Sequence, residues 1–239
     1  MYLKKIRKKI KSTFIYDAFK NFFSESKTSY AETFGEDLFV ESFFKNIKKG
    51  FYVDIGCNLP KNGSLTFKLY KRNWTGIKVD ISERSIELNN LLRKKDINLN
   101  LSVGSKKDTV NAYIFYDNCT MNTVNKKFSL FTKKSVNKEP SIKKIKQLTL
   151  DEILKINKVK NIDYLNIDVE GYEEDVLAGF KIDMYRPELV SIEIHDRKCP
   201  PLENKIYKYF MRNKYSLVSI YGWTYFFSSN QKNNIHFNY

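Results

Sequence analysis

The stretch Phe51-Tyr-Val-Asp-Ile-Gly-Cys57 decides the fold of this chain. Its apolar residues predict a buried strand, and the acid and glycine at its end predict a turn. A second run, Gly76-Ile-Lys-Val-Asp80, ends in another acid after an intervening helical segment. Doubly wound α/β sheets build a nucleoside pocket from a strand, a glycine turn, a helix and a second strand that ends in an acid. The two runs therefore predict such a sheet, with a nucleoside site at its carboxyl edge.

The loop after the first strand favours a nucleoside that carries no phosphates. None of the five residues after Gly56 is glycine, so the glycine-rich pattern that cradles a pyrophosphate is absent. The sulfonium and amino groups of S-adenosylmethionine are cationic and suit a carboxylate such as Asp54. Asp80 is placed to accept hydrogen bonds from ribose hydroxyls. The alternative interpretation is an ordinary βαβ unit whose acids bind nothing.

The composition is typical of a globular protein in a reducing compartment. The chain has 239 residues, is 42% hydrophobic and has no apolar run long enough to span a bilayer. Three cysteines without metal-ligand spacing predict free thiols, and a signal-peptide pattern is absent. We therefore expect a cytoplasmic protein. The net charge of +15 suits an anionic partner, although lysine is common throughout and greatly exceeds arginine.

Residues 1–30 differ from the rest and are predicted to be a separate segment, with residues 31–239 as the main domain. This segment contains eight basic residues and two acidic ones. Leu3, Ile6, Ile10 and Phe14 recur at helical spacing between the basic residues, which predicts a basic amphipathic helix. Such a helix can lie on an anionic membrane, here at its inner face through residues 1–23, or pack on its own domain or a partner.

The remaining pattern alternates strands with helices and closes with a hairpin. The predicted strands are 51–56, 76–80, 99–103, 110–116, 162–167, 189–194, 217–220 and 224–227. The predicted helices are 35–48, 63–71, 83–94, a short one after a capping box at Thr149–Glu152, one ending at a C′ glycine, Gly179, and 201–213. Residues 117–142 are polar and predict a mobile or substrate-covering loop. The fold class is α/β, with a mostly parallel sheet, helices on both faces and a C-terminal antiparallel hairpin.

Acids and a histidine follow several of the predicted strands. The residues in question are Asp54, Asp80, Asp168, Glu170, Glu193 and His195. Open α/β sheets bind ligands beyond the carboxyl ends of their strands, so these residues are expected at one site. Each also has a structural interpretation. Glu170 would stabilise the dipole of a following helix from its first turn, and a single histidine such as His195 is often structural.

Three segments together resemble one family. They are Phe51–Asp80, Asp163–Gly179 (DYLNIDVEGYEEDVLAG) and Arg186–His195 (RPELVSIEIH). In this order, and with Phe34-Gly-Glu-Asp-Leu38 before them, they resemble the FkbM-type S-adenosylmethionine-dependent methyltransferases. The resemblance runs from about residue 30 to about residue 228. It implies a Rossmann-like methyltransferase fold and O-methylation, often of sugar hydroxyls in glycans.

The resemblance also implies a set of site residues. Cofactor-binding residues would be Asp54, Gly56, Cys57, Asn58, Asp80 and Ile81, with the first loop at the methionine end and Asp80 at the ribose. Asp168, Glu170 and His195 would face the reaction, with His195 or Asp168 taking the proton of the acceptor hydroxyl. In an alternative, Asp168 and Glu193 hold a Mg²⁺ ion that acidifies this hydroxyl. Residues 1–30 and 126–147 are not clearly matched.

Three other functions compete with this interpretation. A nucleic-acid methyltransferase would suit the basic charge, but the chain has Cys199-Pro-Pro-Leu202 where an Asn/Asp-Pro-Pro-aromatic turn would be expected, so nucleic acid is not the expected partner. A nicotinamide enzyme would need the absent glycine pattern. A catalytically inactive scaffold could dock on a membrane or a glycan assembly complex through residues 1–30.

Overall fold

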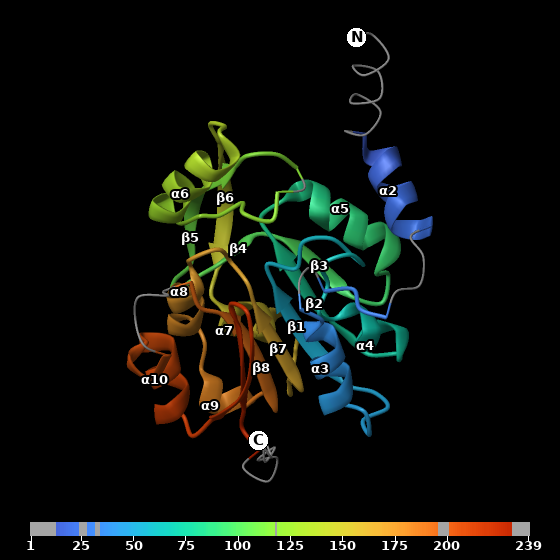
Figure 1. The fold of residues 1–239 in the computed structure, drawn as a ribbon, viewed down its shortest axis with the longest axis vertical. Helices are drawn as coiled ribbons and strands as arrows, with labels where there is room; N and C mark the ends of the chain where they lie inside the picture. The colour runs from blue at the N-terminus through green and yellow to red at the C-terminus, as the bar shows by residue number, and fades with distance from the viewer. Residues whose placement is uncertain (1–12, 24–27, 32–33, 118, 196–200, 231–239) are drawn as a thin grey trace.

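The computed structural model describes residues 13–23, 28–31, 34–117, 119–195 and 201–230 (Figure 1). Its centre is a seven-stranded sheet with the strand order β3-β2-β1-β7-β8-β10-β9. These strands are β1 (Phe51–Ile55), β2 (Thr75–Asp80), β3 (Ile97–Asn100), β7 (Tyr164–Ile167), β8 (Leu189–Glu193), β9 (Ser216–Tyr221) and β10 (Thr224–Ser228). In this sheet β3, β2, β1, β7 and β8 each run parallel to their neighbours, and β10 is antiparallel to β8 and β9. The predicted α/β sheet with a C-terminal antiparallel hairpin is confirmed.

Side chains alternate along the central strands between two cores. Tyr52 and Tyr164 belong to one core, while their neighbours Val53 and Leu165 belong to the other. Parallel strands that are covered on both faces need apolar residues at almost every position, which explains the uninterrupted apolar runs. The polar residues Lys78 in β2 and Asn166 in β7 are buried exceptions, and both lie at the site described below.

Helices cover both faces of this sheet (Figure 1). α3 (Glu36–Phe43) and α4 (Phe67–Lys71) contribute to the core that contains Tyr52. The opposite core receives residues from α7 (Leu150–Ile156), α8 (Glu173–Ala178), α9 (Ile182–Tyr185) and α10 (Lys205–Arg212). α5 (Glu83–Leu92) packs on β2 and β3. The predicted helix over 201–213 is a 3-10 turn, η1 (Pro201–Glu203), followed by α10.

A second sheet, which the sequence pattern did not reveal, stands beside the first. Its strands β4 (Ser102–Val103), β6 (Ser141–Leu148) and β5 (Asp108–Ile114) have the order β4-β6-β5. The predicted strand 99–103 is therefore wrong as a single element, because β3 belongs to the main sheet and β4 to the second. Strand β6 was missed because lysines separate its isoleucines and most of its residues are exposed.

The predicted loop at 117–142 is also corrected. It contains α6 (Lys126–Val136) and the first residues of β6. Asn125 caps α6, since its side chain accepts the backbone N–H groups of Lys127 and Phe128. α6 buries two small polar residues, Ser129 and Thr132, and exposes Leu130 and Phe131. The spacing of its apolar residues therefore does not indicate a helix.

Several helix ends follow the sequence signals and one does not. Ser82 caps α5, and the capping box of Thr149 and Glu152 is present at α7. α8 ends at Gly179 as predicted, with a φ of −95° at this residue. Glycine is needed there because a Cβ atom would lie 2.2 Å from the carbonyl oxygen of Gly104. The helix predicted over 63–71 begins only at Phe67.

The basic N-terminal segment is described in part. α2 (Phe14–Phe23) is helical as predicted, while residues 1–12 lie outside the described residues. Asp17 of α2 lies 3.5 Å from Arg84 of α5, which fixes α2 on the domain. In the described part of the chain, no helix is long and apolar enough to cross a membrane.

Candidate active site

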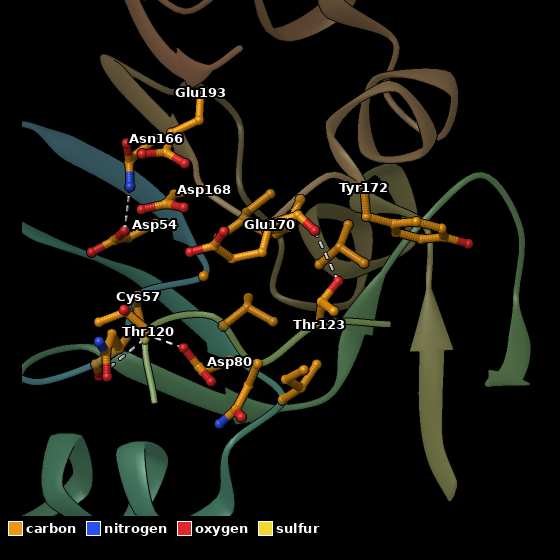
Figure 2. Close-up of a pocket in the computed structure, with 18 of the residues that line it drawn as sticks. Asp54, Cys57, Asp80, Thr120, Thr123, Asn166, Asp168, Glu170, Tyr172 and Glu193 are labelled. Atoms are coloured by element: carbon orange, nitrogen blue, oxygen red, sulfur yellow. Dashed lines mark hydrogen bonds between the residues drawn. The ribbon is translucent and has the colours of Figure 1, made fainter. Parts of the chain in front are cut away.

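A cavity opens at the carboxyl ends of β1, β2 and β7, the edge predicted from the sequence (Figure 2). It contains about 1160 Å³ of space free of protein atoms, part of it open to solvent. The loop after β1, the end of β2, residues 119–124 and the turn after β7 form its walls.

The charged residues that line the cavity are acidic. They are Glu36, Asp54, Asp80, Asp168, Glu170 and Glu193. Lysine and arginine are absent from the described lining residues, although the chain as a whole carries a net charge of +15. A phosphate group would be repelled here, whereas a cationic ligand would be attracted. The cavity therefore selects against nucleotides with a pyrophosphate and for a positively charged cofactor.

Gly56 turns the chain at the end of β1. Its φ is +80°, and the backbone N–H groups of Gly56 and Cys57 both donate to the carbonyl of Val79, at 2.9 and 3.1 Å. A Cβ atom at this position would lie 1.5 Å from the carbonyl oxygen of Asp168. The glycine is therefore required by a close approach of two backbone segments, in addition to the left-handed turn.

Asp54 is a buried anchor at the floor of the cavity. One carboxylate oxygen accepts the amide of Asn166 at 2.9 Å, and the other accepts the hydroxyl of Thr66 at 2.8 Å. The Nζ of Lys78 lies 3.5 Å from the second oxygen. Only 2% of Asp54 is exposed, so it holds β1, β7 and the following loop together while its charge remains beside the cavity.

Asp80 ends β2 and faces the same cavity (Figure 2). Its two oxygens accept the backbone N–H groups of Asn58, at 2.8 Å, and Ser82, at 2.7 Å. Each carboxylate oxygen has a second lone pair for a ligand hydroxyl. Burial raises the pKa of Asp80 to about 6, although its backbone hydrogen bonds oppose this. Ile81 follows it and also lines the cavity.

The other predicted cofactor residues shape the loop between β1 and α4. Asn58 has a φ of +41°, and its carbonyl accepts the side-chain amide of Asn89 at 2.8 Å. Cys57 is buried, and burial raises the pKa of its thiol well above the usual value. Both residues line the cavity, and the thiol is held in its neutral form. The structure thus brings all six predicted cofactor residues to one cavity.

The predicted catalytic residues gather at the far side of the cavity. The Nε2 of His195 lies 3.0 Å from Glu193 and 3.7 Å from Glu170, measured to their carboxylate oxygens. The ligand-type atoms of these three residues lie within 4.8 Å of one another, which is compact enough to hold a metal ion. Asp168 and Glu193 line the cavity, whereas His195 is not a lining residue and its ring packs near the rings of Phe128 and Trp223.

The pKa values of Asp168 and His195 are both raised in this cluster. Burial, followed by the charges of Glu193 and Glu170, holds the pKa of Asp168 well above its usual range. Burial lowers the pKa of His195, but the contact with Glu193 and the charges of Glu173 and Glu170 outweigh this effect and raise it. Both residues therefore bind a proton more tightly than an ordinary aspartate or histidine does.

The position of Glu170 differs from the sequence expectation. Its φ is +55°, and α8 begins only at Glu173, so Glu170 does not stabilise the helix from its first turn. Glu173 does this, and its carboxylate also accepts the backbone N–H groups of Gly171, at 3.1 Å, and Val169, at 3.3 Å. The chain thus makes a tight turn before the helix, and Glu170 lies in this turn and lines the cavity.

The segment 119–128 closes one side of the cavity. The hydroxyl of Thr123 donates to the carbonyl of Glu170 at 2.9 Å (Figure 2). The amide of Asn125 donates to the carbonyl of Gly171. The ring of Phe128 lies 5.0 Å from the ring of His195. Sequence reasoning missed these contacts, because only the tertiary structure brings residues 123–128 against the turn after β7.

Two further residues of the site could have been recognised from the sequence. Asn166 and Lys78 interrupt otherwise apolar strands, and a polar residue at a buried strand position needs a partner. Their partner is Asp54 in both cases. The signal was therefore present in the sequence, but the identity of the partner was not.

The raised pKa values predict an unusual pH dependence of stability. Asp80, Asp168, Glu173 and His195 all bind protons more tightly in the folded chain. Their contribution to stability is therefore present at low pH and is lost as pH rises through their folded pKa values, for Asp80 about 6. In thermal unfolding without cofactor, Asp80→Asn should reduce the decrease in Tm between about pH 5 and pH 7.5, by about 3 °C. An unchanged decrease would contradict the assignment.

Comparison with known families agrees with the geometry. Residues 54–217 match the methyltransferase FkbM domain. The match covers most of the chain, so the protein belongs to this family of methyltransferases, and its sheet is a Rossmann-like methyltransferase fold. A search of curated proteins returned no match.

Proposed function

We propose that the protein transfers a methyl group from S-adenosylmethionine to a hydroxyl group, with sugar hydroxyls as the first acceptors to test. The observation that carries the proposal is the acid-lined cavity at the carboxyl edge of a methyltransferase sheet. S-adenosylmethionine is a cation without phosphates, so it suits this lining. When bound, it supplies an electrophilic methyl group.

The residues of the cavity divide between binding and reaction. Asp80 would accept the ribose hydroxyls, and the loop from Gly56 to Asn58 would adjoin the methionine end. The charge of Asp54 beside this loop would favour the cationic groups of the cofactor. An acceptor would lie near Thr120, Tyr172 and the acids of the lining, whose oxygens can accept hydrogen bonds from sugar hydroxyls.

Calorimetric titration of S-adenosylmethionine into the full chain tests the cofactor. We expect micromolar binding, and Asp80→Asn should weaken it by about tenfold to hundredfold because two charge-assisted hydrogen bonds are lost. Asp183→Asn, at an exposed aspartate of α9, is the matched control and should bind normally. The proposal fails if the intact chain does not bind S-adenosylmethionine, or if it binds NAD instead.

We further propose that Asp168 accepts the proton of the acceptor hydroxyl. It lines the cavity, and its raised pKa makes its carboxylate a stronger base than an ordinary aspartate. His195, which is not a lining residue, would be a positioning residue that offsets the charges of Glu193 and Glu170.

Substitutions of Asp168 and His195 should therefore have different effects on turnover. With an acceptor found by screening sugars, Asp168→Asn should lower turnover by about 10²–10⁴-fold and leave S-adenosylmethionine affinity nearly unchanged. His195→Gln should lower turnover less and shift the pH profile, because the charge beside Glu193 is removed. If His195→Gln is the more damaging change and abolishes the pH dependence, His195 is the base.

A divalent cation is the second candidate for activating the hydroxyl. Glu170, Glu193 and His195 form the set that could hold it, while the Asp168–Glu193 pair expected from the sequence shares only Glu193 with this set. Oxygen ligands suit Mg²⁺, and a histidine nitrogen is more typical of transition metals. Turnover that survives EDTA would exclude this version, and loss restored by a divalent ion would establish it.

The cavity also bears on the competing functions. A nucleic-acid acceptor would have to approach an acidic cavity, so we propose that nucleic acid is not the substrate. Absence of S-adenosylmethionine binding in the titration above would favour the inactive scaffold, and turnover with any acceptor would exclude it.

A further inference from the structure

α2 exposes an apolar face that the described part of the domain does not cover. Ile15, Phe19, Phe22 and Phe23 are each 61–79% exposed, and we call these four residues the apolar face of α2. The three phenylalanine rings cluster, with centroids 4.4 Å apart for Phe19 and Phe23 and 4.9 Å apart for Phe22 and Phe23. Exposed apolar patches of this kind usually mark an interaction surface.

The opposite side of α2 is fixed to the domain. Asp17 is buried and lies 3.5 Å from Arg84, whose guanidinium also stands over the ring of Phe14 at 5.2 Å. These contacts with α5 determine which way the helix faces. The apolar face of α2 is therefore held outward, away from its own domain.

Positive charge accompanies this face. Residues 1–12, just before α2, contain six basic residues and no acid, and Lys20 lies within α2. Further along the chain, exposed lysines flank exposed apolar residues on α6 (Leu130 and Phe131) and β6 (Ile142). In Figure 1, α2, α6 and the end of β6 that follows α6 lie toward the same end of the molecule.

We propose that the apolar face of α2 docks on the surface of an anionic lipid bilayer. A helix with bulky apolar residues on one face and basic residues around it is suited to the bilayer interface, where the rings enter the acyl boundary and the lysines meet anionic headgroups. A second copy of the chain is less suitable, because it would bring two strongly basic segments together.

Vesicle flotation with the full chain tests this proposal. We expect binding to phosphatidylcholine vesicles that contain about 30% phosphatidylglycerol, and weaker binding to phosphatidylcholine alone or at high salt. The triple variant Phe19→Ser/Phe22→Ser/Phe23→Ser should reduce binding by about tenfold or more. Ile156→Ser/Met184→Ser is the matched control, because both residues are similarly exposed but lie on α7 and α9; it should bind like the parent.

Two further measurements make the outcome unambiguous. The triple variant should keep the parent's Tm and S-adenosylmethionine affinity, because its residues are exposed and lie outside the cavity; this separates the test from the proposed function. Absence of vesicle binding, or binding that the triple variant retains, would overturn the proposal. Self-association that the triple variant abolishes, without vesicle binding, would assign the face to a second copy instead.

Discussion

Gly56→Ala is expected to abolish cofactor binding and to destabilise the fold by about 3 kcal/mol or more. The new Cβ atom would lie 1.5 Å from the carbonyl oxygen of Asp168, and that oxygen belongs to backbone that cannot rotate away. The loop after β1 would have to move. The two hydrogen bonds to Val79 and the position of Asn58 beneath Asp80 would be lost with it.

Gly35→Ala is the matched control for this change. Gly35 has almost the same φ, +77° compared with +80° at Gly56, but its nearest neighbour is a flexible leucine side chain at 3.3 Å. It should cost only the strain of a left-handed alanine, about 1–2 kcal/mol. Chemical denaturation and calorimetric titration of both variants give the comparison. Equal losses of stability would show that the conformation at Gly56, rather than the contact with Asp168, is what matters.

Arg93→Met is expected to cost about 3–5 kcal/mol of stability, because it leaves a buried carboxylate without its partner. Arg93 is fully buried beneath the cofactor loop. It donates to Asp96 at 3.0 Å, to the hydroxyl of Tyr52 at 2.7 Å and to the carbonyl of Pro60 at 2.8 Å. It also donates to Thr66, which in turn donates to Asp54. The same variant should therefore weaken S-adenosylmethionine binding.

The double variant Arg93→Met/Asp96→Asn tests the cause. Asparagine can still accept hydrogen bonds from Tyr52 and from the backbone of Gly76, and it carries no charge. It should recover about 1 kcal/mol or more relative to Arg93→Met, because the unpaired buried charge is gone. If chemical denaturation shows that the stability losses of Arg93→Met and Asp96→Asn simply add in the double variant, packing rather than the unpaired charge of Asp96 explains the effect.

Apolar runs and strand-end acids were readable in the sequence because they follow local rules. Parallel strands buried on both faces must be apolar along their length, so β1, β2, β7 and β8 were all predicted. Chain order then placed Asp54, Asp80, Asp168 and Glu193 at one edge of the sheet. The methyltransferase fold and the composition of the cavity followed from this arrangement.

The elements that were missed lack this local signal. β6 and α6 carry lysines on their solvent side and bury few apolar residues, so their periodicity is weak. Their stability comes from pairing with β5 and from hydrogen bonds to the turn after β7.

By itself, the sequence determined the sheet, its edge and the acids that gather there, since each depends on residue type and on order along the chain. The tertiary structure alone decided which of these acids is a buried anchor, as Asp54 is, and which face the cavity. It also decided that Asp168 and His195 share a cluster with Glu170 and Glu193. Proton affinity and exposure depend on neighbours that are distant in sequence, and only the folded chain brings those neighbours together.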